Sequence, residues 1–218
     1  MSDARGEILA RVRAALADVP AGELPDDVPV ARAYRRRDEA AMPEVLERFE
    51  DRVRDYRAGV SRCGPGEVAA RVLAACRGWG AERMAVPSAL PAQWRPDGIE
   101  LVEDRGLSAD ELDRLDGAIT GCAVAIAQTG TLVLDGHGAC GRRVLTLVPD
   151  HHICVVGEDQ IVDLVPEAIA AVSPAVVQQR LPITLISGGS ATSDIELHRV
   201  EGVHGPRNLL VLIVAGGA

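Results

Sequence analysis

The residues best suited to chemistry lie between positions 187 and 206. This segment reads Ser-Gly-Gly-Ser-Ala-Thr-Ser-Asp-Ile-Glu-Leu-His-Arg-Val-Glu-Gly-Val-His-Gly-Pro and separates two apolar runs, 183–186 and 209–214, that predict buried strands. Glycines let a main chain approach a ligand closely, and the N–H groups of such a turn can form a concave anion site. A helix that begins near Asp194 would add the positive end of its dipole. We therefore predict an anion-binding loop in this segment.

Three side chains of the segment could take part in proton transfer. Asp194 and Glu196 could orient a donor or act as acid and base, and His204 is the histidine nearest to them. The same two carboxylates could instead serve as a helix cap and a surface charge, so the catalytic residue stays unknown. The ligand-binding candidates of the segment are Ser187, Gly188, Ser190 and Thr192.

Two further polar loops fall at strand ends, at residues 128–131 and 135–143. The first could be an ordinary glycine turn, and the second could be a flexible exposed loop. The second loop also carries two adjacent arginines, which could hold a carboxylate or a phosphate. The ligand-binding candidates from these loops are Thr129, Gly130, Thr131 and Arg142.

Composition excludes several classes of function. The net charge of −9 and the pI of about 5.1 argue against nucleic-acid binding, and all 23 basic residues are Arg, so lysine chemistry is excluded. The five cysteines show no C-x-x-C spacing, and their odd number suits free thiols in a cytoplasmic protein. No apolar run approaches the length of a membrane span. We predict no metal site and no intrinsic cofactor, with a small anion as the possible ligand.

The distribution of apolar residues predicts that the chain consists of two parts. Apolar residues at helical spacing predict one helix between Ile8 and Val19 and a second at 43–58. We expect an N-terminal helical arm over residues 1–60 and an α/β domain over residues 61–218. The sequence leaves open whether the arm packs within one chain or between copies in a homo-oligomer.

Beyond residue 63, short apolar strands alternate with helical patterns, which is typical of a mainly parallel sheet with helices on both faces. Ligands of such sheets bind outside the carboxyl ends of the strands. Four runs follow one another without a helix between them and predict hairpins inserted in this mixed sheet: 118–127, 131–134, 144–148 and 153–156.

Several of these segments together resemble the lactate-utilisation (LUD) domain family. The motifs that carry the resemblance are Ala127-Gln-Thr-Gly-Thr-Leu-Val-Leu134, Leu145-Thr-Leu-Val-Pro149, His152-Ile-Cys-Val-Val156, Ser187-Gly-Gly-Ser-Ala-Thr-Ser-Asp-Ile-Glu196 and Gly202-Val-His-Gly-Pro206. The resemblance runs from about Cys63 to the C-terminus. It implies a fold like that of ribose-5-phosphate isomerase and the CoA-transferases.

The resemblance also implies a role in oxidising L-lactate to pyruvate beside two partner proteins that carry iron–sulfur clusters. The chain departs from the usual family pattern at Gln128, where Glu is usual, and at Gly189, where Pro is common. If that glutamate were a catalytic carboxylate, Gln128 would remove its charge and its nucleophilicity.

Three functions are therefore open. The first is a cytoplasmic component of a lactate-oxidising system that binds substrate, cofactor or partner without carrying redox centres. The second is an autonomous enzyme of acyl/CoA or phosphosugar chemistry that uses the glycine-rich loops. The third is a non-catalytic docking scaffold, with the N-terminal arm as its contact surface.

Overall fold

The computed structural model describes residues 4–216 apart from residues 21, 25, 26, 28, 29, 32, 194–198, 203 and 204. The chain divides into two compact units, Met1–Tyr34 and Arg35–Ala218. The first unit contains helix α1 (Ala4–Ala15), which has no buried residue. The second unit contains all the other helices and strands that the structure describes.

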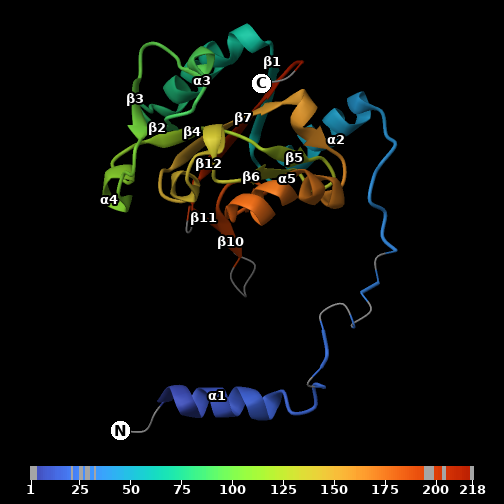
Figure 1. The fold of residues 1–218 in the computed structure, drawn as a ribbon. Helices are drawn as coiled ribbons and strands as arrows, with labels where there is room; N and C mark the ends of the chain where they lie inside the picture. The colour runs from blue at the N-terminus through green and yellow to red at the C-terminus, as the bar shows by residue number, and fades with distance from the viewer. Residues whose placement is uncertain are drawn as a thin grey trace. The chain divides into compact units, whose positions relative to one another are not determined.

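The second unit is built on a six-stranded sheet (Figure 1). Its strand order is β1-β12-β7-β4-β2-β3, and every neighbouring pair is parallel. This arrangement confirms the prediction of a mainly parallel mixed α/β fold. The strands are β1 (Gly59–Cys63), β2 (Arg83–Pro87), β3 (Glu100–Asp104), β4 (Gly117–Gly121), β7 (His151–Gly157) and β12 (Asn208–Val214).

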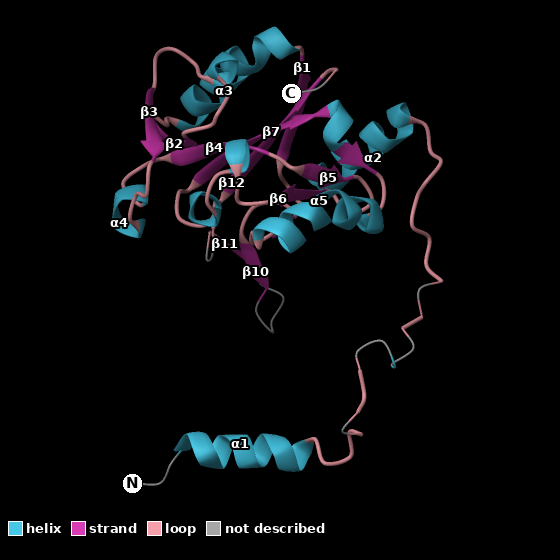
Figure 2. Ribbon diagram, in the orientation of Figure 1, coloured by secondary structure: helices cyan, strands magenta, loops and turns pink. Residues whose placement is uncertain are grey.

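Both faces of this sheet are apolar because side chains alternate along buried strands. On β7, Cys154 and Val156 belong to one buried cluster, and Ile153 and Val155 belong to another. The first cluster includes residues of helix α2 (Met42–Asp55), and the second includes residues of helix α3 (Val68–Trp79). Helices therefore cover both faces of the sheet (Figure 2).

A second, four-stranded sheet lies on the α2 side, with the order β8-β5-β6-β9. Strand β6 pairs antiparallel with both β5 and β9, so the expected hairpins form a separate sheet rather than an insertion. Helix α5 (Val165–Gln179) packs on this sheet through Ala168 and Val172. The four strands are β5 (Val124–Ile126), β6 (Thr131–Leu134), β8 (Ile161–Val162) and β9 (Thr184–Ile186).

Helix α2 belongs to the α/β unit, although the sequence pattern assigned it to the arm. Its residues Val45, Leu46, Phe49 and Val53 are buried in the cluster between the two sheets, and Phe49 is fully buried. The α/β unit therefore begins at Arg35 rather than near residue 61.

The prediction of a strand at residues 144–148 is wrong, because a 3₁₀ helix, η5 (Arg143–Thr146), occupies this place. Among the described residues, no helix is long and apolar enough to cross a membrane. The remaining elements are α4 (Ala109–Leu112), the antiparallel pair β10 (Ala191–Ser193) and β11 (Arg199–Glu201), and the 3₁₀ turns η2 (Pro65–Glu67), η3 (Ala92–Trp94), η4 (Gly138–Cys140) and η6 (Glu158–Gln160).

Candidate functional site

Two of the predicted loops meet through their hydroxyl groups. Strand β6 pairs with β9, and this register brings Thr131 next to Ser187. The Thr131 Oγ1 lies 2.7 Å from the Ser187 Oγ and 2.7 Å from the Thr129 Oγ1. These three side chains therefore form one hydrogen-bonded chain that ties the two loops together.

The glycines of these loops approach helix α2 and its C-terminal end. Gly130 and Gly188 have φ angles of +58° and +84°. A Cβ atom on Gly130 would lie 2.7 Å from the Arg52 Cβ, and one on Gly188 would lie 2.5 Å from the Tyr56 Cβ. Close packing against this helical segment thus accounts for these two glycines, whereas the sequence suggested approach to a ligand.

Arg142 forms its hydrogen bonds with Asp104 and Leu107 rather than with the Ser187 loop. Its guanidinium donates to both carboxylate oxygens of Asp104, at 2.7 and 2.5 Å, and to the Leu107 carbonyl at 2.8 Å. The Asp104 side chain is only 2% exposed, and the Arg142 guanidinium beside it holds the pKa of that carboxyl below its usual value against the opposing effect of burial. Arg142 thus fastens the 135–143 loop to the carboxyl end of β3.

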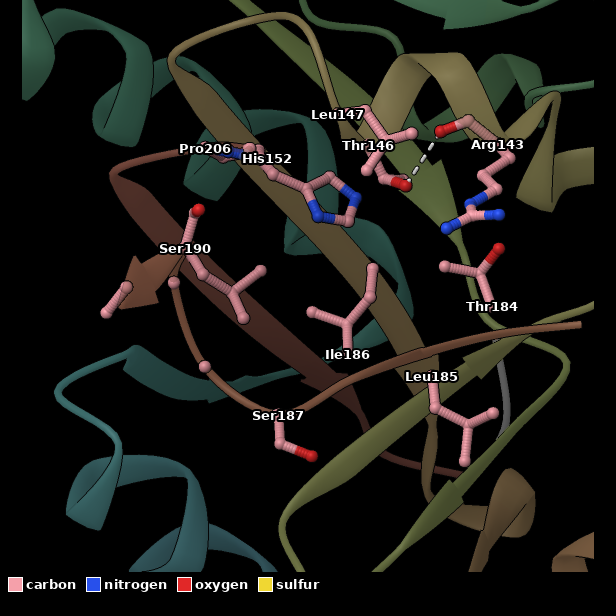
Figure 3. A pocket seen from close by; sticks show the side chains of 15 residues that line it. Arg143, Thr146, Leu147, His152, Thr184, Leu185, Ile186, Ser187, Ser190 and Pro206 are labelled. Atoms are coloured by element: carbon pink, nitrogen blue, oxygen red, sulfur yellow. Dashed lines mark hydrogen bonds between the residues drawn. The ribbon is translucent and has the colours of Figure 1, made fainter. Parts of the chain in front are cut away.

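A pocket of about 280 Å³ lies under the Ser187 loop (Figure 3). Its walls come from η5, from the start of β7 and β12, and from residues 184–191 and 205–206. In the register of the sheet, His152 pairs with Leu209 of β12 and with Ala118 of β4. The pocket therefore lies at the amino ends of these strands rather than at their carboxyl ends. The reason is that β9, which precedes the Ser187 loop, belongs to the smaller sheet.

His152 forms the floor of this pocket. Its side chain is 1% exposed, and its imidazole points into the cavity (Figure 3). The Nε2 atom lies 2.8 Å from the Thr120 Oγ1 on β4. Burial lowers the pKa of His152 to about 4, because the charged form loses its hydration. The imidazole is therefore neutral at physiological pH.

Arg143, adjacent to Arg142, faces the same pocket. Its guanidinium points into the cavity above Thr184 (Figure 3). Within the described part of the chain, no carboxylate pairs with this guanidinium. Thr146, which is 4% exposed, donates its hydroxyl to the Arg143 carbonyl at 2.9 Å and so fixes the 3₁₀ turn. The pocket thus combines a neutral imidazole with a guanidinium that no carboxylate of the described residues engages.

The remaining predicted site residues fall into three groups: residues that line the pocket, a residue of the β10–β11 ribbon, and residues outside the described part of the chain. Ser187, Gly188 and Ser190 line the pocket. The main chain of Thr192 pairs with Val200 in the β10–β11 ribbon. The candidates Asp194, Glu196 and His204 lie outside the described residues, as does the helix expected near Asp194.

A partial signal for His152 is present in the sequence. Two successive histidines in an apolar strand predict one that points inward and one that points outward. In the structure, His152 is buried, whereas the ring of His151 stacks on Trp79 with a centroid distance of 4.7 Å. Arg143 was one of two arginines expected to bind an anion, but nothing in the sequence separated it from Arg142.

A second cleft, of about 570 Å³, lies beside Gln128 and is rich in charged groups. Arg48 of α2 donates to Asp163, whose side chain is 3% exposed, and Arg48 Nη1 lies 3.6 Å from Asp38 Oδ2. Arg35 Nη2 lies 3.4 Å from the same Asp38 oxygen. Four of the six charged side chains that line this cleft thus contact one another: Arg35, Asp38, Arg48 and Asp163.

The pKa values of Asp163 and Asp38 are shifted in opposite directions in this cleft. The Asp163 Oδ2 is buried, and no hydrogen-bond donor reaches it among the described residues. Burial and the neighbouring Asp38 raise the pKa of Asp163, whereas the hydrogen bond from Asp163 lowers the pKa of Asp38.

The cysteines contribute no charged group to either site. All five are free and buried, including Cys140 of the 135–143 loop. Burial raises the pKa of Cys76 to about 11 and raises the pKa of Cys140 further. Among the described residues, no group of three or more His, Cys, Asp and Glu side chains is arranged to hold a metal ion.

Comparison with known proteins assigns the fold to a family. Residues 81–214 match the model of the LUD domain. The chain is 45% identical over 214 residues to "Lactate utilization protein C" of Deinococcus radiodurans, covering 98% of this chain and 96% of that protein. The protein therefore belongs to the LUD domain family.

Further relatives agree with this assignment. A protein of the same name from Shouchella clausii is 31% identical over 113 residues, which is 51% of this chain and 49% of that protein. The crystal structure of a DUF162 family protein from Deinococcus radiodurans superposes with a TM-score of 0.71 at 43% identity. The match covers 80% of this chain and 99% of that one, so the fold class is shared.

Proposed function

We propose that this protein is a cytoplasmic component of a lactate-utilisation system that oxidises L-lactate to pyruvate. In this system it binds substrate, cofactor or partner, and iron–sulfur proteins carry the electrons. The observation that carries the proposal is the near full-length similarity, at 45% identity, to a protein named for lactate utilisation. The pocket supports it, because a cation beside a neutral imidazole suits the binding of a small organic anion.

The test is to recover the tagged protein from a lysate of its native cells in the presence of L-lactate. We expect the recovered complex to contain iron and to oxidise lactate, and the isolated chain to do neither. Lactate oxidation by the isolated chain, or a recovered complex without such activity, would contradict the proposal. Turnover of a thioester or a sugar phosphate by the isolated chain would favour the autonomous enzyme instead.

A docking role of the first unit is a second candidate. It is favoured by helix α1, a twelve-residue helix without buried residues whose Ile8, Leu9 and Val12 are exposed. Isolated helices of this length are marginal in water, so contact with iron–sulfur partners would stabilise α1. Deletion of residues 1–34 should then abolish recovery of the partners while residues 35–218 remain folded. Unchanged recovery would exclude this role.

A further inference from the structure

Arg143 differs in its ion pairing from most other arginines of the second unit. Most arginines of the second unit lie in ion pairs, as Arg142 does with Asp104 and Arg48 does with Asp163. Arg143 is exposed at the mouth of the His152 pocket, and within the described residues no carboxylate neutralises it. A guanidinium at a pocket mouth binds a planar carboxylate with two parallel hydrogen bonds. The mouth of the pocket therefore suits an anionic group of a ligand.

The floor of the pocket offers a different kind of contact. Within the described residues, the contact of Nε2 with Thr120 is the only hydrogen bond of the His152 side chain. If Nε2 accepts the Thr120 proton, then Nδ1 carries a hydrogen and can donate to an oxo or hydroxyl oxygen. If Nε2 donates to Thr120, then Nδ1 can accept from a hydroxyl group. In both cases a neutral polar oxygen, rather than a second charge, suits the floor.

The apolar wall limits the rest of the ligand. Ile186, Pro206 and Leu209 line the pocket between its mouth and its floor. A methyl group would lie against these side chains, whereas a second charged group would lose its hydration there without a partner. The volume of about 280 Å³ accommodates a ligand of a few carbon atoms.

We propose that the His152 pocket binds a short 2-hydroxy- or 2-oxo-carboxylate, with its carboxylate on Arg143 and its C2 oxygen hydrogen-bonded to His152. The choice of this acid class rests on the proposed function, whereas the pairing of an anion with Arg143 does not. His152 is a binding group in this arrangement, because an imidazole that stays neutral down to acidic pH is a weak base.

The test is titration of the full chain with L-lactate, pyruvate, propionate and inorganic phosphate, followed by isothermal calorimetry. We expect L-lactate or pyruvate to bind at least about tenfold more tightly than propionate, which lacks the C2 oxygen, and than phosphate. Arg143→Gln should weaken this binding by roughly tenfold or more, and Arg143→Lys should restore part of it.

Arg142→Gln is the matched comparison, because it removes the neighbouring guanidinium that Asp104 engages. We expect its affinity to stay within about twofold of that of the native chain, once circular dichroism shows that the variant is folded. Loss of binding in Arg142→Gln but not in Arg143→Gln would overturn the proposal. So would equal binding of propionate or phosphate, or the absence of binding by either acid.

This titration needs no partner protein, so its failure is distinguishable from failure of the proposed function. If neither acid binds while the recovered complex oxidises lactate, the assignment of the pocket is wrong and the proposed function stands. If the acids bind through Arg143 while no lactate-oxidising complex is recovered, the pocket stands and the proposed function is wrong.

Discussion

The His152 pocket and the Asp163 cleft use charged residues in opposite ways. The cleft holds six charged side chains, and four of them contact one another around Arg48 and Asp38. The pocket holds fewer such groups, but its guanidinium at Arg143 has no carboxylate partner in the described residues, and its imidazole is neutral. The charged groups that contact one another therefore form an internal network in the cleft, whereas the pocket keeps a guanidinium that no carboxylate of the described residues engages.

The largest expected effect is the loss of stability when the buried residue that holds α2 in the core, beside the cleft, is truncated. Arg48 and Arg52 flank Phe49 on α2, and Phe49 is fully buried between the two sheets. Phe49→Ala should lower the free energy of unfolding by about 3–5 kcal/mol, because it leaves a cavity in the core. Urea denaturation measures this effect. Leu16→Ala, at a residue that is 55% exposed, is the control and should change it by less than about 0.5 kcal/mol.

A cost below about 1 kcal/mol for Phe49→Ala would mean that α2 is not part of the core of the α/β unit. The cleft would then be a loosely held surface feature, and its contrast with the pocket would lose its structural basis.

The second effect is the pH dependence that the pocket contributes. The pKa of His152 is lowered from 6.5 to about 4, so the unfolded chain binds this proton more readily than the native one does. Stability from this residue is complete above pH 6.5 and is lost as the pH falls towards 4, by about 3 kcal/mol. His152→Gln should remove this slope in urea denaturation over a pH series. His151→Gln, at the half-exposed neighbour, should retain it, and an equal slope in the native chain and in His152→Gln would contradict the assignment.

The third effect is the loss of stability on substitution of a loop glycine, and it tests whether close packing against α2 requires Gly130. Gly130 and Gly138 have similar φ angles of +58° and +53°, but a Cβ on Gly130 would meet Arg52, whereas one on Gly138 meets nothing within 4 Å. Gly138→Ala should therefore cost about 1 kcal/mol of stability from backbone strain alone. Gly130→Ala should cost about 2–3 kcal/mol, because the steric conflict with α2 is added. Equal costs in thermal denaturation would show that α2 does not constrain this loop.

The smallest effect is the pH dependence of stability that Asp163 contributes in the cleft. Its sign is opposite to that of the pH dependence from His152. Burial, followed by Asp38, raises the pKa of Asp163 above its ordinary value of 3.8, while Arg48 opposes this change. Stability from Asp163 is therefore present at acidic pH and is lost as the pH rises through the raised pKa. Asp163→Asn keeps an acceptor for Arg48 and removes the titrating carboxyl. It should gain stability relative to the native chain as the pH rises from 4 to 7, as measured by urea denaturation.

Asp38→Asn provides the matched comparison in this cleft, because the pKa of Asp38 is lowered rather than raised. Its substitution removes a carboxylate that the native state favours in its charged form. The difference in stability from the native chain should therefore be unfavourable at neutral pH and should shrink as the pH falls. The same sign of pH dependence in both variants would contradict the opposite pKa shifts of the two carboxyls.

Part of the fold and of the site could be predicted because local patterns report burial. The apolar runs predicted the strands of a mainly parallel sheet, and the pair His151–His152 predicted one buried ring. The strand expected at residues 144–148 is instead a 3₁₀ turn, because an apolar run reports burial but not the backbone conformation. The boundary of the arm was misplaced for a similar reason, since an amphipathic pattern does not say which surface covers its apolar face.

Contacts between distant parts of the chain could not be predicted. Arg142 and Arg143 are adjacent and chemically identical, yet Asp104, which is 38 residues from Arg142, engages only one of them. The opposite pKa shifts of Asp38 and Asp163 likewise depend on how two remote segments meet. No local pattern carries this information.

The sequence by itself determined the family motifs, the mainly parallel α/β class and the hydroxyl-rich loop at Ser187, because each depends on residue types at short spacing. The tertiary structure decided where that loop lies, by adding β9 to the smaller sheet and so placing it over the amino ends of β7 and β12. It also decided that His152 is buried and neutral and that, among the described residues, no carboxylate pairs with Arg143. The physical reason is that burial and pairing belong to the environment of a side chain, and the packing of remote segments creates that environment.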